Sequence, residues 1–190
     1  MISKQALRKQ IQAKKQGTPV ATLDKWSQQA VHCLEQQTYW QQADTVVLYY
    51  SMVDEVNTRL LVERAHLAGK RVYLPVMDGD VLVLRLFSGR ESMKTASKYR
   101  ILEPTGAILP AAQYQAIDLV IVPGVAFTCE GYRLGRGKGY YDKLLPLISA
   151  PCVGICWPIQ LVDHLPTEPH DVSLDGLISS DGIIKIFTKY

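Results

Sequence analysis

Ten consecutive residues, Arg133 to Asp142, combine three cations, three alternate glycines, two tyrosines and a carboxylate in the order Arg-Leu-Gly-Arg-Gly-Lys-Gly-Tyr-Tyr-Asp. Glycines lack Cβ, so a polyanion can approach the backbone N–H groups closely while the cations neutralise its charge. The closing carboxylate is a hard oxygen ligand of the kind that holds Mg²⁺ beside nucleotide phosphates. The run therefore predicts a site for a magnesium-bound polyphosphate, and hence a nucleotide-using enzyme.

Two familiar phosphate-binding motifs do not fit this run. A P-loop around Gly137-Lys138 needs glycine at position 132 and Ser or Thr at position 139, which are Tyr132 and Gly139. The dinucleotide fingerprint needs glycine at position 140, which is Tyr140. The alternating glycines instead favour an extended loop laid along phosphates, and a helix that begins near Tyr140 can add its dipole.

The composition is that of a globular protein. A chain of 190 residues can bury one sizeable core, and we expect a single domain over residues 1–190. The net charge of +3 is mild and indicates no nucleic-acid partner. No apolar run reaches membrane-spanning length, and the first residues are cationic and rich in glutamine. We therefore expect a cytoplasmic monomer whose partners are small molecules, with no membrane and no nucleic acid among them.

Helices and strands are expected to alternate along the chain. Ser3 is a plausible N-cap of a first helix, in which Leu7 and Ile11 form a buried stripe and Lys4 and Arg8 flank it. Further helices are expected over 22–37, over 59–68 and from Tyr140 or Tyr141. Strands are expected over 45–50, 71–75, 82–87, 119–122, 152–156, 176–179 and 183–187. Residues 88–109 are expected to be irregular, with a break at Glu103-Pro104.

This alternation predicts an α/β fold of three layers, in which helices flank a mostly parallel central sheet. The fold is expected to be Rossmann-like without a dinucleotide fingerprint. The continuous apolar run at 119–122 suits a strand buried on both faces. Ligands of such sheets bind beyond the carboxyl ends of the strands, and the glycine run follows this strand after a few residues.

The segments 123–127 and 131–142 resemble the signature of the 5-formyltetrahydrofolate cyclo-ligases, also called 5,10-methenyltetrahydrofolate synthetases. The similarity covers essentially the whole chain. It includes Lys4 and Arg8, the segments 55–58 and 101–104, Gln160, His170-Asp171 and Asp175. Cys129 and Glu130 stand in a loop that varies in the family, and Asn57 stands where an acid is frequent.

The resemblance implies that the protein uses MgATP to convert 5-formyltetrahydrofolate into 5,10-methenyltetrahydrofolate, ADP and phosphate. A formamide oxygen is a poor leaving group, so the γ-phosphoryl group moves onto it, N10 attacks the resulting imidate phosphate, and phosphate leaves. N10 belongs to the same molecule as the formyl carbon, and such proximity can reach effective molarities of about 10⁵ M or more. The protein then needs to position and neutralise the reactants rather than supply a nucleophile.

The resemblance also implies roles for individual residues. ATP binding falls to Lys4, Arg8, Arg133, Leu134, Gly135, Arg136, Gly137, Lys138, Gly139, Tyr140 and Tyr141. Folate binding falls to Tyr50, Glu55, Arg136, Gly137, Lys138, Gly139 and Tyr140, where the Glu55 carboxylate can accept two parallel N–H donors from the pterin. Catalysis falls to Arg136, Lys138 and Tyr140, and Mg²⁺ binding to Asp142 and Asp175.

Structural roles remain open alternatives for several of these residues. Lys4 and Arg8 can form a solvated helix face, and Tyr141 can pack its ring under the loop. Asp142 can cap a helix, and Asp175 can form a turn before the strand that follows it. His170 is interpreted as structural or as a support to the site.

Three other functions are compatible with parts of the sequence. A sugar-phosphate isomerase or transferase would use glycines and cations but not a pair of aspartates for MgATP. A small ATP-dependent kinase would share the site and differ in its acceptor. A non-catalytic nucleic-acid module would use the basic first helix and would bind duplexes in a strongly salt-dependent way.

Overall fold

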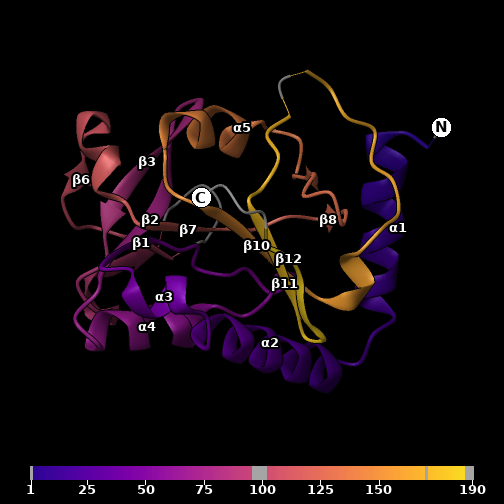
Figure 1. Cartoon of the computed structure of the whole chain (residues 1–190), viewed down its shortest axis with the longest axis horizontal. Coiled ribbons are helices and arrows are strands. Elements are labelled where there is room, and N and C mark those ends of the chain that lie inside the picture. The colour runs from indigo at the N-terminus through magenta and orange to yellow at the C-terminus, as the bar shows by residue number, and fades with distance from the viewer. Residues whose placement is uncertain (1, 96–101, 170, 187–190) are drawn as a thin grey trace.

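The computed structural model describes residues 2–95, 102–169 and 171–186 (Figure 1). Eight strands form its main sheet: β1 Thr45–Val47, β2 Arg71–Asp78, β3 Val81–Leu86, β6 Ile108–Leu109, β7 Leu119–Val122, β10 Cys152–Cys156, β11 Gly176–Ser179 and β12 Gly182–Ile186. Their order is β12-β11-β10-β7-β1-β2-β3-β6. The five strands from β11 to β2 are parallel, whereas β12, β3 and β6 join antiparallel at the two edges. The predicted mostly parallel sheet is confirmed.

Helices cover both faces of this sheet, which gives the three predicted layers. They are α2 Val20–Glu35, α3 Thr38–Gln42, α4 Arg59–Leu67 and α5 Tyr140–Leu144. Figure 1 shows α2, α3 and α4 along one side of the sheet and α5 on the other. Successive strand residues point to opposite faces. Val46 accordingly packs in a core with Leu34 and Leu61, whereas Val47 packs in a second core with Leu144. No described helix is long and apolar enough to cross a membrane.

The first helix, α1 Lys4–Gln16, begins where the sequence predicts. Ser3 Oγ accepts the N–H of Ala6 at 3.1 Å, and Leu7 and Ile11 are buried. They pack on Ala126 and Leu134. These two residues belong to a small hairpin, β8 Ala126–Phe127 and β9 Arg133–Leu134, that no periodicity predicted. Residues 133 and 134 therefore stand in a strand and not in the predicted extended loop.

The predicted irregularity of residues 88–109 is wrong for its described part. Strands β4 Met93–Thr95 and β5 Leu102–Pro104 pair with each other, and β6 joins the edge of the main sheet. Glu103 and Pro104 thus lie inside a strand and not at a break. Strands of two or three residues contain too few positions to show an alternating pattern, so they produce no periodic signal. Residues 96–101 lie outside the described residues.

Two strand lengths also differ from the prediction, for one physical reason. β1 ends at Val47 instead of position 50, and its pairing with β2 stops at Tyr73. β2 continues to Asp78 by pairing with β3 alone. Pro75, which has no N–H to donate, lies in this one-sided part of β2. The residues after β1 are thereby released from the sheet and can turn toward a ligand.

The order of strands fixes where a ligand can bind. β1 lies between β7 and β2, and the chain connects β1 to β2 through α4 before it returns to β7 on the other side of β1. Neighbouring parallel strands whose connections run to opposite faces leave a crevice beyond their carboxyl ends. Tyr49 and Tyr50 follow β1, and Pro123 and Gly124 follow β7. That residues 1–190 form a single domain stays a prediction.

Candidate active site

A cavity of about 410 Å³ lies at this crevice and brings together most of the predicted site. One part of its wall is aromatic and apolar, with Tyr49, Tyr50, Leu74, Met77 and Leu82. The opposite part comes from the glycine run, with Arg133, Gly135, Arg136, Lys138, Tyr140 and Tyr141. Glu55 also lines the cavity. Predicted folate residues and predicted phosphate residues therefore face the same space, although about eighty positions separate them in sequence.

The glycine run has the backbone geometry of a tight loop. Gly137 (φ 98°) and Gly139 (φ 67°) occupy the left-handed region that side chains rarely adopt. Arg8 of α1 crosses to this loop, and its Nε donates to the carbonyl of Gly135 at 2.8 Å. A Cβ at Gly137 would lie 3.4 Å from the Arg8 guanidinium. Arg8 thus lies at the glycine loop and helps to fix its shape. That it binds ATP stays a prediction.

Lys4, the other predicted cation of α1, lies against a different segment. Its Nζ is 2.6 Å from Glu168 Oε2 and 2.8 Å from Asp171 Oδ2. It therefore ties the first turn of α1 to the segment before β11. His170, within that segment, lies outside the described residues.

Arg133 forms the buried ionic contact of the loop. Its side chain is 3% exposed, and Nη2 is 2.8 Å from Asp142 Oδ1. The guanidinium also lies over the ring of Tyr141, 5.4 Å from its centroid. Burial raises the pKa of Tyr141, so this hydroxyl stays protonated. Tyr141 thus packs beneath the loop, and Asp142, the predicted Mg²⁺ ligand, already partners a cation.

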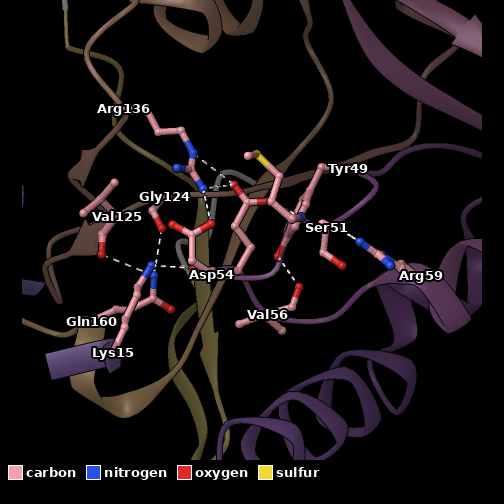
Figure 2. A network of polar contacts seen from close by, with 12 residues as sticks. Lys15, Tyr49, Ser51, Asp54, Val56, Arg59, Gly124, Val125, Arg136 and Gln160 are labelled. Carbon is pink, nitrogen blue, oxygen red and sulfur yellow. Dashed lines mark hydrogen bonds and ion pairs between the residues drawn. The ribbon is translucent and has the colours of Figure 1, made fainter. Parts of the chain in front are cut away.

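Arg136 extends from the loop to the turn that follows β1, as Figure 2 shows. Its Nη2 is 2.6 Å from Asp54 Oδ1 and 3.0 Å from Glu55 Oε1. Burial disfavours the charged form of Asp54, but the hydrogen bond from Arg136 and the positive charges of Arg136 and Lys15 together outweigh it and lower the pKa of this carboxyl. The predicted catalytic cation and the predicted pterin-binding carboxylate are therefore in direct contact.

The other two predicted catalytic residues also reach the cavity. Lys138 lines it with an exposed side chain. Tyr140 begins α5, and its hydroxyl donates to the carbonyl of Gly79 at 3.2 Å. This contact joins the loop to the β2–β3 turn.

Asp175 does not join this group of residues. Its Oδ2 accepts the N–H of Cys152 at 2.9 Å, at the amino ends of β10 and β11. It lines a separate cavity of about 300 Å³, where Pro146 and Val172 also lie. The two aspartates predicted to share a magnesium ion therefore line no common cavity. Among the described residues, no three His, Cys, Asp or Glu side chains gather closely enough to hold a metal.

Two charged residues at the site were missed by the sequence analysis. Asp54 holds Arg136, and Lys15 is a buried lysine, 6% exposed, whose Nζ donates to the backbone carbonyl of Asp54 at 2.7 Å. Lys15 also lies over the ring of Trp157, 5.4 Å from its centroid. Its position was readable, because it follows Ile11 by four residues on the buried stripe.

Gln160 holds the backbone segment after β7, in which Gly124 lines the cavity. It is 1% exposed, and its Nε2 donates to the carbonyls of Gly124 at 2.7 Å and Val125 at 3.2 Å (Figure 2). This contact fixes the segment that follows β7.

Comparison with known proteins agrees with this geometry. A family model described as the 5-formyltetrahydrofolate cyclo-ligase family matches residues 1–180. The 5-formyltetrahydrofolate cyclo-ligase of Escherichia coli K12 is 34% identical over 144 residues, which cover 72% of this chain and 78% of the relative. A probable cyclo-ligase of Schizosaccharomyces pombe is 32% identical over 163 residues, with 77% and 79% covered.

A solved structure supports the same relationship at the level of the fold. The NMR structure of Aquifex aeolicus 5,10-methenyltetrahydrofolate synthetase has a TM-score of 0.83 and 29% identity, and the match covers 95% of this chain and 91% of that chain. The chain therefore belongs to the 5-formyltetrahydrofolate cyclo-ligase family, the cyclo-ligases of folate one-carbon metabolism, and this membership implies the use of ATP.

Proposed function

We propose that the cavity at the ends of β1 and β7 converts 5-formyltetrahydrofolate into 5,10-methenyltetrahydrofolate at the expense of MgATP. The observation that carries the proposal is the meeting of Glu55 with the glycine loop in one cavity. A reaction that transfers a phosphoryl group to a folate atom needs both substrates in one space. The direct contact of Arg136 with Glu55 meets that need.

The folate is proposed to enter along the apolar part of the wall. Leu74, Met77 and Leu82 offer a surface for its ring system, and Tyr50 lies beside them. The Glu55 carboxylate lies at the inner end of the turn after β1, 12% exposed, where it can accept N–H donors of the pterin. The orientation of the pterin then depends on burial of its apolar ring faces and on its hydrogen bonds to the Glu55 carboxylate.

The phosphates of ATP are proposed to lie along residues 135–139. The glycines permit close approach of backbone N–H groups, and Arg136 and Lys138 supply positive charge where the phosphoryl group moves. Arg8 and Lys4 stabilise the first helix against neighbouring segments, and Arg8 also reaches the loop itself. Tyr140, at the start of α5, can hydrogen-bond a phosphate or the folate.

The chemistry follows from this placement. The γ-phosphoryl group passes to the formyl oxygen, N10 attacks the formyl carbon and loses its proton, and phosphate leaves with that oxygen and takes up the proton. No nucleophile of the protein takes part. Arg136 and Lys138 oppose the negative charge that builds up during transfer, each through a charge-assisted hydrogen bond of about 1.5 to 3 kcal/mol.

Magnesium is proposed to bind at Asp142, together with the phosphates. Mg²⁺ in nucleotide sites usually takes one or two carboxylates and completes its shell with phosphate oxygens and water, so one aspartate beside the loop fits it. The ion would neutralise part of the phosphate charge. Asp175 remains a less favoured second ligand, because it lines a different cavity.

A spectroscopic assay tests the proposed reaction. The pure protein is incubated with 5-formyltetrahydrofolate and MgATP while the absorbance of the methenyl product is followed. We expect the absorbance to rise in step with ADP, and no rise when either substrate is omitted. An unchanged absorbance under conditions where ATP binds would contradict the proposal, and ADP without methenyl product would indicate a kinase with another acceptor.

Replacement of Lys138 tests its proposed part in phosphoryl transfer. Because the side chain is exposed and lines the cavity, Lys138→Ala is expected to lower kcat by roughly 10- to 100-fold, the equivalent of one charge-assisted hydrogen bond, with little change in melting temperature. Lys9→Ala removes an exposed lysine of α1 and serves as the matched control. Turnover equal to that of the control would remove Lys138 from the chemistry.

Magnesium titrations of two variants compare the two aspartates. Asp142→Asn keeps an oxygen that can accept from Arg133, so the fold should persist, whereas the affinity for Mg²⁺ should fall. We expect the Mg²⁺ concentration for half-maximal turnover to rise several-fold in Asp142→Asn and to stay unchanged in Asp175→Asn. Melting curves verify that both variants are folded at the assay temperature. The reverse pattern would place the ion at Asp175.

A further inference from the structure

The Arg136 guanidinium is shared between two adjacent carboxylates that differ in how they are bound elsewhere. Both carboxylate oxygens of Glu55 accept hydrogen bonds. Oε1 accepts from Arg136 Nη2 at 3.0 Å, and Oε2 accepts from the N–H of Met52 at 3.0 Å. Asp54 gives the shorter contact, 2.6 Å from Oδ1 to Arg136 Nη2. Arg136 therefore has a second carboxylate on which it can remain if Glu55 takes another partner.

That situation arises when the pterin binds, if Glu55 is its acceptor as proposed above. The N–H groups of the pterin and the guanidinium of Arg136 then compete for the same carboxylate. An arginine left without a carboxylate in this half-buried position would lose an ionic hydrogen bond and its orientation. With Asp54 beside it, Arg136 can yield Glu55 and stay at the boundary between the pterin and the phosphates.

Asp54 is itself held by a buried group. Lys15 Nζ donates to the Asp54 carbonyl (Figure 2). The same nitrogen lies over the ring of Trp157, 5.4 Å from its centroid. Burial lowers the pKa of Lys15, while the nearby Asp54 carboxylate opposes that shift. A buried ammonium is costly unless it is paired, so Lys15 favours the conformation of the turn that brings the Asp54 carbonyl to it.

Helix α1 reaches both partners of the contact. Arg8 holds the loop through the Gly135 carbonyl, and Lys15, two turns further along, holds the turn through the Asp54 carbonyl. A single helix thus sets the distance between Gly135, which precedes Arg136, and Asp54, whose carboxylate accepts a hydrogen bond from Arg136.

We propose that Asp54 is a further positioning residue of the reaction, which retains Arg136 between the two substrates while the pterin takes Glu55, and that Lys15 fixes Asp54 in that place. The proposal rests on the proposed function of Glu55 and Arg136. If the proposal holds, Asp54 affects turnover and folate binding only through Arg136. If Asp54 had only a structural role, its substitution would lower activity equally with and without that arginine.

A double-mutant cycle separates these two cases. Wild type, Asp54→Asn, Arg136→Ala and the double variant are compared for kcat/KM toward 5-formyltetrahydrofolate at saturating MgATP. Asp54→Asn is expected to lower kcat/KM about tenfold or more, because Arg136 loses a charge-assisted hydrogen bond, and to have little effect when Arg136 is already alanine. An equal loss in both backgrounds, or no loss in the wild-type background, would overturn the proposal.

Equilibrium binding gives a second readout that needs no turnover. With a non-hydrolysable ATP analogue present, Asp54→Asn should weaken 5-formyltetrahydrofolate binding several-fold, because the pterin must then displace Arg136 from its last carboxylate. The effect should vanish in the Arg136→Ala background and persist there if the proposal is wrong. Lys15→Met, which replaces the ammonium with an apolar side chain of similar length, should behave like Asp54→Asn.

Two controls complete the experiment. Asp24→Asn changes an exposed aspartate of α2 and should match the wild type in both measurements. Wild-type turnover is measured first, because its absence would refute the proposed function itself. Wild-type turnover together with equal losses in the two backgrounds would refute only the positioning role of Asp54.

Discussion

Arg136 lies in the glycine loop that follows β9, and its side chain forms ion pairs with Asp54 and Glu55 in the turn after β1. This ion pair joins two segments about eighty residues apart, and it lies at the cavity that both segments line. Its ends are held by one helix, through Arg8 at the loop and Lys15 at the turn. The relative placement of the glycine loop and the Glu55 carboxylate therefore depends on this contact.

The surrounding fold makes the contact possible. β1 is short, so the chain leaves the sheet at Leu48 and can form the acidic turn, and β7 ends beside it at the crevice. The hairpin of β8 and β9 leads directly into the glycine loop, and α1 packs on that hairpin through Leu7 and Ile11. Arg133, buried against Asp142 and Tyr141, anchors the other end of the loop. Removal of either partner would leave the other charge poorly paired, so this contact holds that end of the loop in place.

Much of this arrangement was readable from the sequence because it rests on local patterns. The cap at Ser3, the stripe of Leu7 and Ile11, and the apolar run 119–122 each predicted their element correctly. Short pieces were not readable, because strands of two or three residues show no period. Long-range contacts were also invisible: nothing local to Lys15 or Asp54 says that they meet. Asp175 was paired with Asp142 by resemblance alone, and only the three-dimensional arrangement shows that Asp175 lies at the amino ends of β10 and β11, in a cavity that Asp142 does not line.

The central claim is that the pterin and the phosphates of ATP meet at Arg136. The most direct test is a crystal structure of the protein with 5-formyltetrahydrofolate, Mg²⁺ and a non-hydrolysable ATP analogue. We expect the pterin on Glu55, the phosphates along residues 135–139, Arg136 between them on Asp54, and the formyl oxygen about 3 to 3.5 Å from the γ-phosphorus. A pterin bound away from Glu55, or phosphates bound outside the glycine loop, would contradict it.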